Sequence, residues 1–193
     1  MCATWPSGLR TEFMKSQHQD PIYSQISQVK DAVSEVLEHA KKLGATAAEA
    51  AMSSTSGLSV STRMGEVETI EFNQDGGLGI SVYVGNNKGS ASTADLNPKT
   101  LRAVVEKAID IAKFTSDDPC NGIADKELLE FSPKDLDLFH PWDVSPEQGI
   151  DLCHAAEQAA LNADERIVNS DGASFSSHQG LRVYGNSHGL IAG

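Results

Sequence analysis

Apolar residues recur every three or four positions in three stretches of the chain, which is the spacing of one buried face on an α-helix. Each stretch begins with a capping residue followed by proline, at Asp20-Pro21, Asn97-Pro98 and Ser145-Pro146. The first helix is expected to end at Gly44, a typical C-cap position. The residues expected to face inward are Ile26, Val29, Val33, Val36, Leu37, Ala40 and Leu43 in the first helix, Leu101, Val104, Val105, Ala108, Ile111 and Ala112 in the second, and Ile150, Cys153, Ala156, Ala160 and Leu161 in the third.

Between residues 47 and 93 the pattern changes to an alternation of apolar and polar residues, which is typical of half-buried β-strands. In "GLSVSTR", Leu58, Val60 and Thr62 alternate with polar side chains, and the same alternation returns from Leu78 to Val84. Met64-Gly65 and "GNNKG" at 85–89 have the composition of turns. The segment therefore predicts an antiparallel β-meander, with the polar "SAST" near a sheet edge.

One part of this meander breaks the alternation. In "EVETIEF", Ile70 and Phe72 share their parity with Glu66 and Glu68, so apolar and charged side chains fall on one face. Either a β-bulge, or a strand that crosses between two environments, would account for the pattern.

An acidic, proline-containing connector separates two parts of the chain. Residues 115–145 contain three prolines and weak periodicity, whereas strand-like alternation follows the third helix and continues to Gly193. We expect an α+β fold: an antiparallel β-meander packed with helices, then a connector and the start of a second α+β region. The expected divisions are a disordered extension (1–19), an amino-terminal α+β domain (20–116), a linker (117–145) and the start of a second, truncated domain (146–193). Residues 1–13 lack periodicity and are expected to be an addition upstream of a start at Met14.

The charge balance argues against nucleic acid as a partner. The chain has 15 basic and 27 acidic residues and a net charge of −12, which repels a phosphate backbone. No apolar run is long enough to span a bilayer, so no membrane partner is expected either. The three cysteines, Cys2, Cys120 and Cys153, form no CxxC pair, and reduced thiols in a cytoplasmic protein explain them best. Cys153 lies on a predicted helix face and is interpreted as a core residue rather than a nucleophile.

The glycines of "DGGLGISVYVGNNKGSAS" raise the question of a phosphate-binding loop. A dinucleotide fingerprint needs its glycines after a strand and at the start of a helix, but Gly76, Gly77 and Gly79 precede a strand, and Val82 stands at the third glycine position. A P-loop needs Gly-Lys-Ser/Thr, whereas "GNNKGS" has its lysine before the glycine. We interpret these glycines as permitting tight turns and close backbone approach.

No residue set in the sequence predicts a catalytic, cofactor-binding or metal site. The histidines are His18, His39, His140, His154, His178 and His188, and none forms an HExxH-type pair. For His178 and His188, in the terminal β region, spacing alone leaves a distant metal ligand open. Glu66, Glu68 and Glu71 are expected to be solvated, and the serine-rich stretches contain no GxSxG elbow.

Several uncommon blocks occur in an order that resembles one protein family. They are "GLSVSTRMGEVETIEFNQDGGLGISVYVGNNKGSASTADL", "DDPCNGIADKELL", "DLDLFHPWDVSPEQ" and "NSHGLIAG". Together they are similar to the PmbA/TldD family, and most of all to its PmbA (also called TldE) branch, once described as a modulator of DNA gyrase. The similarity runs from about Gln28 to Gly193. Since the family's full chains are far longer, the resemblance implies an amino-terminal fragment.

The resemblance implies a non-catalytic subunit of a zinc metallopeptidase that degrades or matures peptides. In the family, TldD-type subunits hold zinc on an HExxxH helix, PmbA-type subunits lack that motif, and the two form a heterodimer. This sequence has no HExxxH, which also fits a TldD-type chain truncated before its motif, although the block from Ser61 to Leu96 favours PmbA. The expected partners are a TldD-type subunit, which would carry the zinc, peptide substrates and, as a further expectation, a second copy. No catalytic residue can be carried over from the family.

Two other functions stay open at this point: a stand-alone protein-binding or scaffold module that modulates DNA gyrase or its inhibitors, and a self-sufficient hydrolase. For the subunit, an antiparallel sheet offers a physical role, because an extended peptide can add to an exposed strand edge through main-chain hydrogen bonds. We therefore hypothesise that the meander holds peptide or the partner subunit.

Overall fold

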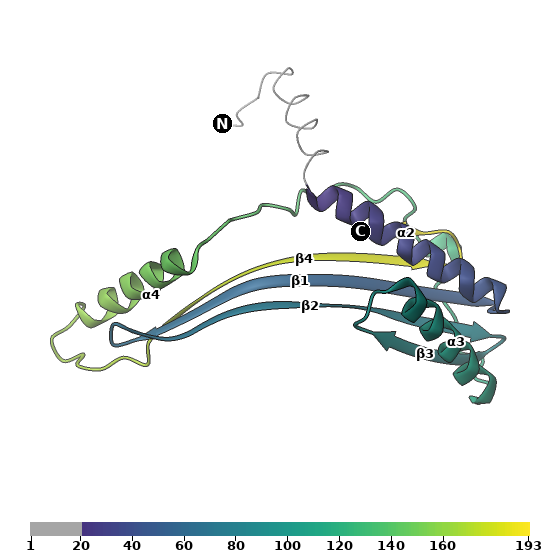
Figure 1. Ribbon diagram of the computed structural model, residues 1–193, viewed down its shortest axis with the longest axis horizontal. Coiled ribbons are helices and arrows are strands. Elements are labelled where there is room, and N and C mark those ends of the chain that lie inside the picture. Colours follow the sequence, from purple (N-terminus) through teal and green to yellow (C-terminus); the bar gives the residue numbers. More distant parts are fainter. Residues whose placement is uncertain (1–20) are drawn as a thin grey trace, which may run out of the picture. The chain divides into compact units, whose positions relative to one another are not determined.

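The computed structural model describes residues 21–193, which form a five-stranded antiparallel sheet with helices (Figure 1). The expected α+β fold is therefore confirmed, while the predictions for residues 1–19 and for the cap at Asp20 lie outside the described residues. The elements in chain order are α2 (Pro21–Lys42), β1 (Ala47–Arg63), β2 (Glu66–Val84), β3 (Asn87–Thr93), α3 (Pro98–Phe114), a 3-10 turn η1 (Lys126–Leu128), α4 (Pro146–Leu161), β4 (Ala173–Asn186) and β5 (Ile191–Ala192). The strand order is β3-β2-β1-β4-β5. None of the helices within residues 21–193 has the length and apolar character needed to cross a membrane.

The chain divides into two compact units that are discontinuous in sequence. The first, called here the two-helix unit, takes the described residues up to Ser53 together with Gly77–Pro133 and Leu181–Gly193. The second, called the hairpin unit, takes Ser54–Gly76 and Lys134–Gly180. Each of β1, β2 and β4 contributes residues to both units.

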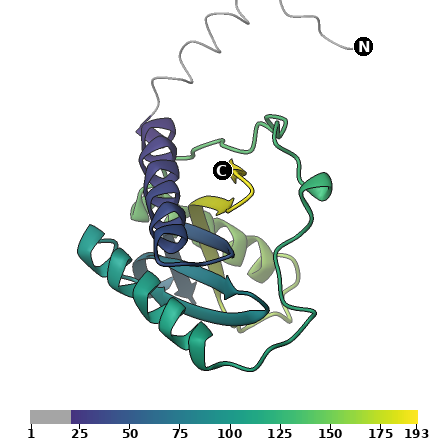
Figure 2. The ribbon, with the colours of Figure 1, turned by 90° about the vertical axis from the view of Figure 1, so that its right-hand side faces the viewer.

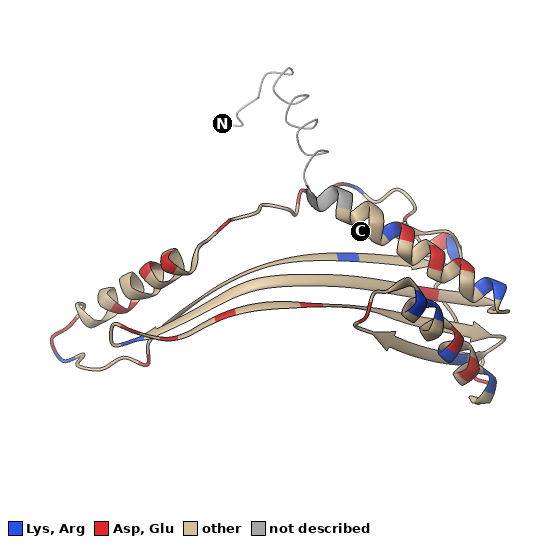
Figure 3. Cartoon of the chain, in the orientation of Figure 1, with Lys and Arg blue, Asp and Glu red and all other residues tan. Residues whose placement is uncertain are grey.

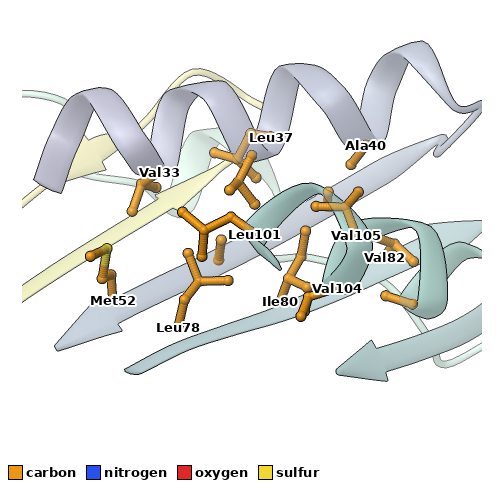
Figure 4. Close-up of a cluster of buried hydrophobic side chains, with 14 of the residues drawn as sticks. Val33, Leu37, Ala40, Met52, Leu78, Ile80, Val82, Leu101, Val104 and Val105 are labelled. Carbon is orange, nitrogen blue, oxygen red and sulfur yellow. The ribbon is translucent and has the colours of Figure 1, made fainter. Parts of the chain in front are cut away.

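In the two-helix unit, α2 and α3 lie side by side against the sheet (Figure 2). Figure 4 shows Val33, Leu37 and Ala40 of α2 directed toward the strands. The remaining labelled core side chains come from β1, β2 and α3: Met52, Leu78, Ile80, Val82, Leu101, Val104 and Val105. Removing one such Val, Leu or Ile side chain from water stabilises the fold by about 1.5–3 kcal/mol, so this layer is the main source of the unit's stability.

Two residues of the predicted helix faces point elsewhere. Ile109 is buried on α3 (3% exposed) and Ile111 is 45% exposed, so the prediction for Ile111 was wrong. Leu43 is 39% exposed because α2 ends at Lys42. The predicted stop at Gly44 is confirmed, since Gly44 has φ +96° and its amide donates to the carbonyl of Lys41.

The hairpin unit has a smaller core between β1, β4 and α4. Leu58, Val60 and Cys153 are buried there, and Ile150, Ala173 and Phe175 pack against them. The predicted start of α4 is confirmed: Ser145 caps it, and the side chains of Ser145 and Gln148 exchange bonds with each other's backbone amides.

The inward face predicted for α4 was partly wrong. Ala156 and Ala160 are exposed, and the buried residues are Gly149, Cys153 and Glu157, spaced four apart. At Gly149 α4 lies close to the sheet, and a Cβ there would crowd the side chains of Val60 (3.1 Å) and Phe175 (3.3 Å).

The glycines of residues 75–92 belong to strands and turns rather than to a helix start. Gly76, Gly77 and Gly79 lie in β2, and Gly85, with φ +62°, lies in the turn before β3. At Gly89 a Cβ would overlap the backbone of α3 at Ala108, so glycine allows that helix to approach β3. The interpretation of these glycines as structural is confirmed.

Candidate functional site

Part of β2 lies at an open edge of the sheet. β3 pairs antiparallel with β2 only from Leu78 to Val84. On the side of β2 away from β1, no strand among the described residues pairs with Glu66–Gly76, the segment called here the open edge. No neighbouring strand occupies its backbone amides and carbonyls on that side, so they can pair with another extended chain, apart from the amide of Gly76, which donates to the side chain of Asp75 (2.7 Å).

The side chains of the open edge explain the broken alternation seen in the sequence. Every residue from Glu66 to Asp75 is exposed, whereas Leu78, Ile80 and Val82 further along the same strand are buried. The second of the two sequence interpretations, a strand that crosses between two environments, is therefore confirmed. The large apolar side chains left exposed are Val67 (43%), Ile70 (45%) and Phe72 (73%).

All charged residues of the open edge are acidic. Glu66, Glu68, Glu71 and Asp75 are its charged residues, and β2 contains no lysine or arginine over its whole length (Figure 3). All four carboxylates are exposed, as expected for Glu66, Glu68 and Glu71. The edge therefore combines free main-chain groups, exposed apolar side chains and an unbalanced negative charge.

His178 and His188, the two histidines left open as metal ligands, lie in different units. The ring of His178 on β4 packs over Gly57 of β1, where a Cβ would overlap the imidazole and crowd Asn73 of β2. His188 lies in the turn between β4 and β5, and its amide donates to Asn186. His18 lies outside the described residues.

The other histidines are part of helices or of the connector. His39 on α2 has its Nε2 atom 3.8 Å from a carboxylate oxygen of Glu106. His140 lies in the connector, with Nε2 2.7 Å from the carbonyl oxygen of Asp137, and His154 is half-buried on α4. Within residues 21–193, no three His, Cys, Asp or Glu side chains gather closely enough to share a metal ion.

A buried carboxylate that sequence reasoning missed holds the β1–β2 turn. Glu157 of α4 is 2% exposed, and its two oxygens accept hydrogen bonds from the amides of Met64 (2.8 Å) and Gly65 (3.0 Å). These two hydrogen bonds, chiefly the one from Gly65, hold the pKa of Glu157 below its usual range. Both turn residues have positive φ, 50° and 80°, an unfavourable conformation for Met64 that the carboxylate stabilises. The sequence signal that could have revealed this burial is the spacing of four residues that places Glu157 on the same helix face as Cys153 and Gly149.

A second polar cluster lies in the two-helix unit. Glu49 follows the buried Ala48, so strand alternation places its side chain on the sheet face away from the helices. The hydroxyls of Tyr83 (3.3 Å) and Tyr184 (3.1 Å) donate to its two carboxylate oxygens. Burial raises the pKa of both tyrosines, and the nearby carboxylate raises each pKa further. The cluster links β1, β2 and β4.

Comparison with known proteins places both parts of the chain in one family. Residues 48–112 match the model described as PmbA/TldA metallopeptidase domain 1, and residues 139–193 match the model of the PmbA/TldA metallopeptidase central domain. Two successive domains of the same family are thus matched in order.

Individual relatives agree with this assignment. The chain is 57% identical to "Metalloprotease PmbA" of Escherichia coli O157:H7 over 165 residues, covering 86% of this chain and 36% of that protein. It is 50% identical to "Metalloprotease PmbA homolog" of Haemophilus influenzae over 186 residues, covering 96% of this chain and 39% of that protein. The chain therefore spans little more than a third of the length of these relatives.

Two solved structures have a similar fold. One, from Bacteroides thetaiotaomicron and named as a modulator of DNA gyrase, has a TM-score of 0.76 at 28% identity, covering 84% of this chain and 37% of that one. The other, TldE from Thermococcus kodakarensis, has a TM-score of 0.69 at 18% identity, covering 83% and 36%.

Proposed function

This chain belongs to the PmbA/TldD metallopeptidase family, and from that premise we propose that it is the amino-terminal part of a non-catalytic, PmbA-type subunit. In this proposal the subunit works in a cytoplasmic heterodimer that degrades or matures peptides. The observation that carries the proposal is the identity of 57% to a protein named as metalloprotease PmbA. The chemistry comes from a TldD-type partner, and this chain contributes binding surface.

The described residues do not fit a zinc site. A protein zinc site needs at least three close N, S or O ligands, and no such group occurs among residues 21–193. We therefore assign no catalytic step to these side chains. The open edge of β2 is the feature of this chain best suited to hold an extended polypeptide, either the peptide or a segment of the partner.

Co-expression with a TldD-type subunit tests the proposal. We expect the TldD-type subunit to be retained on a tagged PmbA-type chain, and the complex to hydrolyse an unfolded peptide in a chelator-sensitive reaction. The tagged chain alone is expected to be inactive. Peptide hydrolysis by this chain alone, in the presence of chelator, would contradict a non-catalytic role.

A second candidate function rests on the name of the Bacteroides thetaiotaomicron structure, a modulator of DNA gyrase. In that case the chain is a protein-binding module that acts on gyrase or on an inhibitor of it. Retention of gyrase on the tagged chain, together with a change in supercoiling rate, distinguishes this function from the peptidase subunit.

A further inference from the structure

From the open edge of β2 we infer that this chain binds cationic peptides in extended form, by addition of a strand along Glu66–Gly76. The inference rests on the proposed function and deepens it, because it names the class of peptide and the segment that receives it. Its basis is the coincidence of three properties on one short segment: unpaired main-chain groups, exposed apolar side chains and unbalanced negative charge.

The main chain of the open edge provides the first part of the binding. An edge strand presents a row of free amides and carbonyls, and an added strand pairs with them whatever its side chains are. β3 occupies this position only beside Leu78–Val84. An added peptide would therefore continue the sheet beside Glu66–Gly76.

Exposed apolar side chains provide the second part. The core of the hairpin unit is formed by β1, β4 and α4, and no β2 residue belongs to it. The hydrophobic core under α4 therefore does not extend beyond β1, and Ile70 and Phe72 of the neighbouring strand β2 stay exposed. Since both have even numbers, they share one face of the strand, where alternate apolar side chains of an added peptide would contact them.

Charge selects among peptides. The four carboxylates of the open edge have no basic residue within β2 to balance them, so lysine or arginine side chains of an added strand would find opposite charges on both faces. The same charges disfavour a second copy of this chain, because edge-to-edge pairing would bring the carboxylates of both copies together.

A purely protective role for these charges makes a different prediction. Edge strands commonly carry charged residues that prevent aggregation, and such an edge should bind no peptide. A protective role does not explain why two large apolar side chains, Phe72 (73% exposed) and Ile70 (45% exposed), lie on the same edge. Peptide binding accounts for the charges and the apolar side chains together.

The test measures fluorescence anisotropy of labelled synthetic peptides with the 193-residue chain. The probes are a short peptide that alternates Lys with Val and its counterpart with Glu in place of Lys. We expect the Lys peptide to bind at least about tenfold more tightly than the Glu peptide. Its affinity should weaken about tenfold from about 0.1 M to about 1 M salt, as the screening length falls from about 10 Å to about 3 Å. Equal binding of the two peptides would overturn the inference.

Two further comparisons locate the contact. The double variant Glu68→Lys/Glu71→Lys should bind the Lys peptide about tenfold or more weakly than the unchanged chain. The matched control Glu38→Lys/Glu127→Lys, at exposed positions of the other unit, should lose much less affinity. N-methylation of the Lys peptide on one alternate set of amides should abolish binding, and methylation of the other set should not. Binding unaffected by methylation of either set would show that no strand is added.

Failure of this inference is distinguishable from failure of the proposed function. If the Lys peptide binds at the edge but no TldD-type subunit is retained, the inference stands and the proposed function fails. If the complex is active and the edge variant binds peptide normally, the inference fails alone. Loss of the TldD-type subunit from the edge variant, with peptide binding intact, would make the edge a subunit contact and also overturn the inference.

Discussion

Glu157 on α4 accepts a hydrogen bond of 3.0 Å from the backbone amide of Gly65, at the tip of the β1–β2 hairpin. Its other oxygen accepts from the amide of Met64 at 2.8 Å. One buried carboxylate thus satisfies both amides of a turn whose residues have positive φ. The hairpin that carries the open edge is held to its own helix by this contact.

We expect Glu157→Gln to destabilise the hairpin unit at neutral pH. The amide keeps one acceptor oxygen and turns an N–H group toward a backbone N–H, so one of the two bonds is lost. Thermal unfolding measures the effect. The matched change Glu165→Gln, at an exposed position, should leave the midpoint nearly unchanged. Equal midpoints for both variants would contradict a role for Glu157 in stability.

The contribution of Glu157 should depend on pH. The folded state holds its pKa below that of an unfolded glutamate, about 4.3, so the folded state binds fewer protons and acid favours unfolding. The contribution is complete above about pH 4.3 and is lost as pH falls through the lower, folded pKa. The difference in stability between wild type and Glu157→Gln should therefore shrink below that pH, as measured by urea unfolding across an acid series.

Leu78→Ala should cost about 2–5 kcal/mol of unfolding free energy, because Leu78 is 1% exposed in the core of the two-helix unit. The matched control is Ile111→Ala on α3, which removes an apolar side chain that is 45% exposed and should cost only about 0.5 kcal/mol. Urea unfolding measures both. A larger loss for Ile111 than for Leu78 would mean that the buried face of α3 includes Ile111 after all.

Tyr83 and Tyr184 should titrate above the usual tyrosine pKa of about 10, because burial most of all, together with Glu49, raises the pKa of each, while a hydrogen bond with Asn186 partly offsets the rise at Tyr184. Glu49→Gln should lower both pKa values but leave them raised, since burial remains. Near-ultraviolet absorbance of the phenolate follows the titration, and Tyr→Phe changes at each position assign it. Since the folded state keeps these protons longer than the unfolded chain, their contribution is complete below about pH 10 and is lost as pH rises through the folded values. No shift between wild type and Glu49→Gln would contradict the cluster.

Cys153 should react with thiol reagents only when the hairpin unit opens. It is 2% exposed, and burial raises the pKa of its thiol, which reduces the reactive thiolate. Cys120 is exposed and should react quickly. Cys153→Ala should therefore leave the amplitude of the fast reaction unchanged, while Cys120→Ser should reduce it. A smaller fast amplitude in Cys153→Ala would identify an accessible thiol at that position.

The helices and their caps could be predicted because their signals are local. Asn97 and Ser145 accept bonds from amides two and three residues further along, so a short stretch of sequence contains the whole motif. The strand β1 was harder to see in full, because its first buried residues, Ala48 and Ala50, give a weak strand signal. Its later part, with Leu58 and Val60, was predicted from alternation.

What the sequence could not predict depends on distant partners. The choice between Ile109 and Ile111 on α3 is made by the sheet beneath the helix, because the spacing placed Ile111 on the predicted face whereas the sheet buries Ile109. The burial of Glu157 depends on two amides more than ninety residues earlier in the chain. The general hypothesis of an exposed edge came from the sequence, but its location depends on where β3 stops pairing with β2.

Burial fixes the register of β2 within the two-helix unit. A slip of one residue would turn Leu78, Ile80 and Val82 out of their core, so their burial fixes the register in which Leu78–Val84 pairs with β3. Pairing with β3 therefore stops at the same residue, Leu78, in every copy of the protein. The hydrophobic layer under α2 and α3 thus determines the residue of β2 at which the open edge begins.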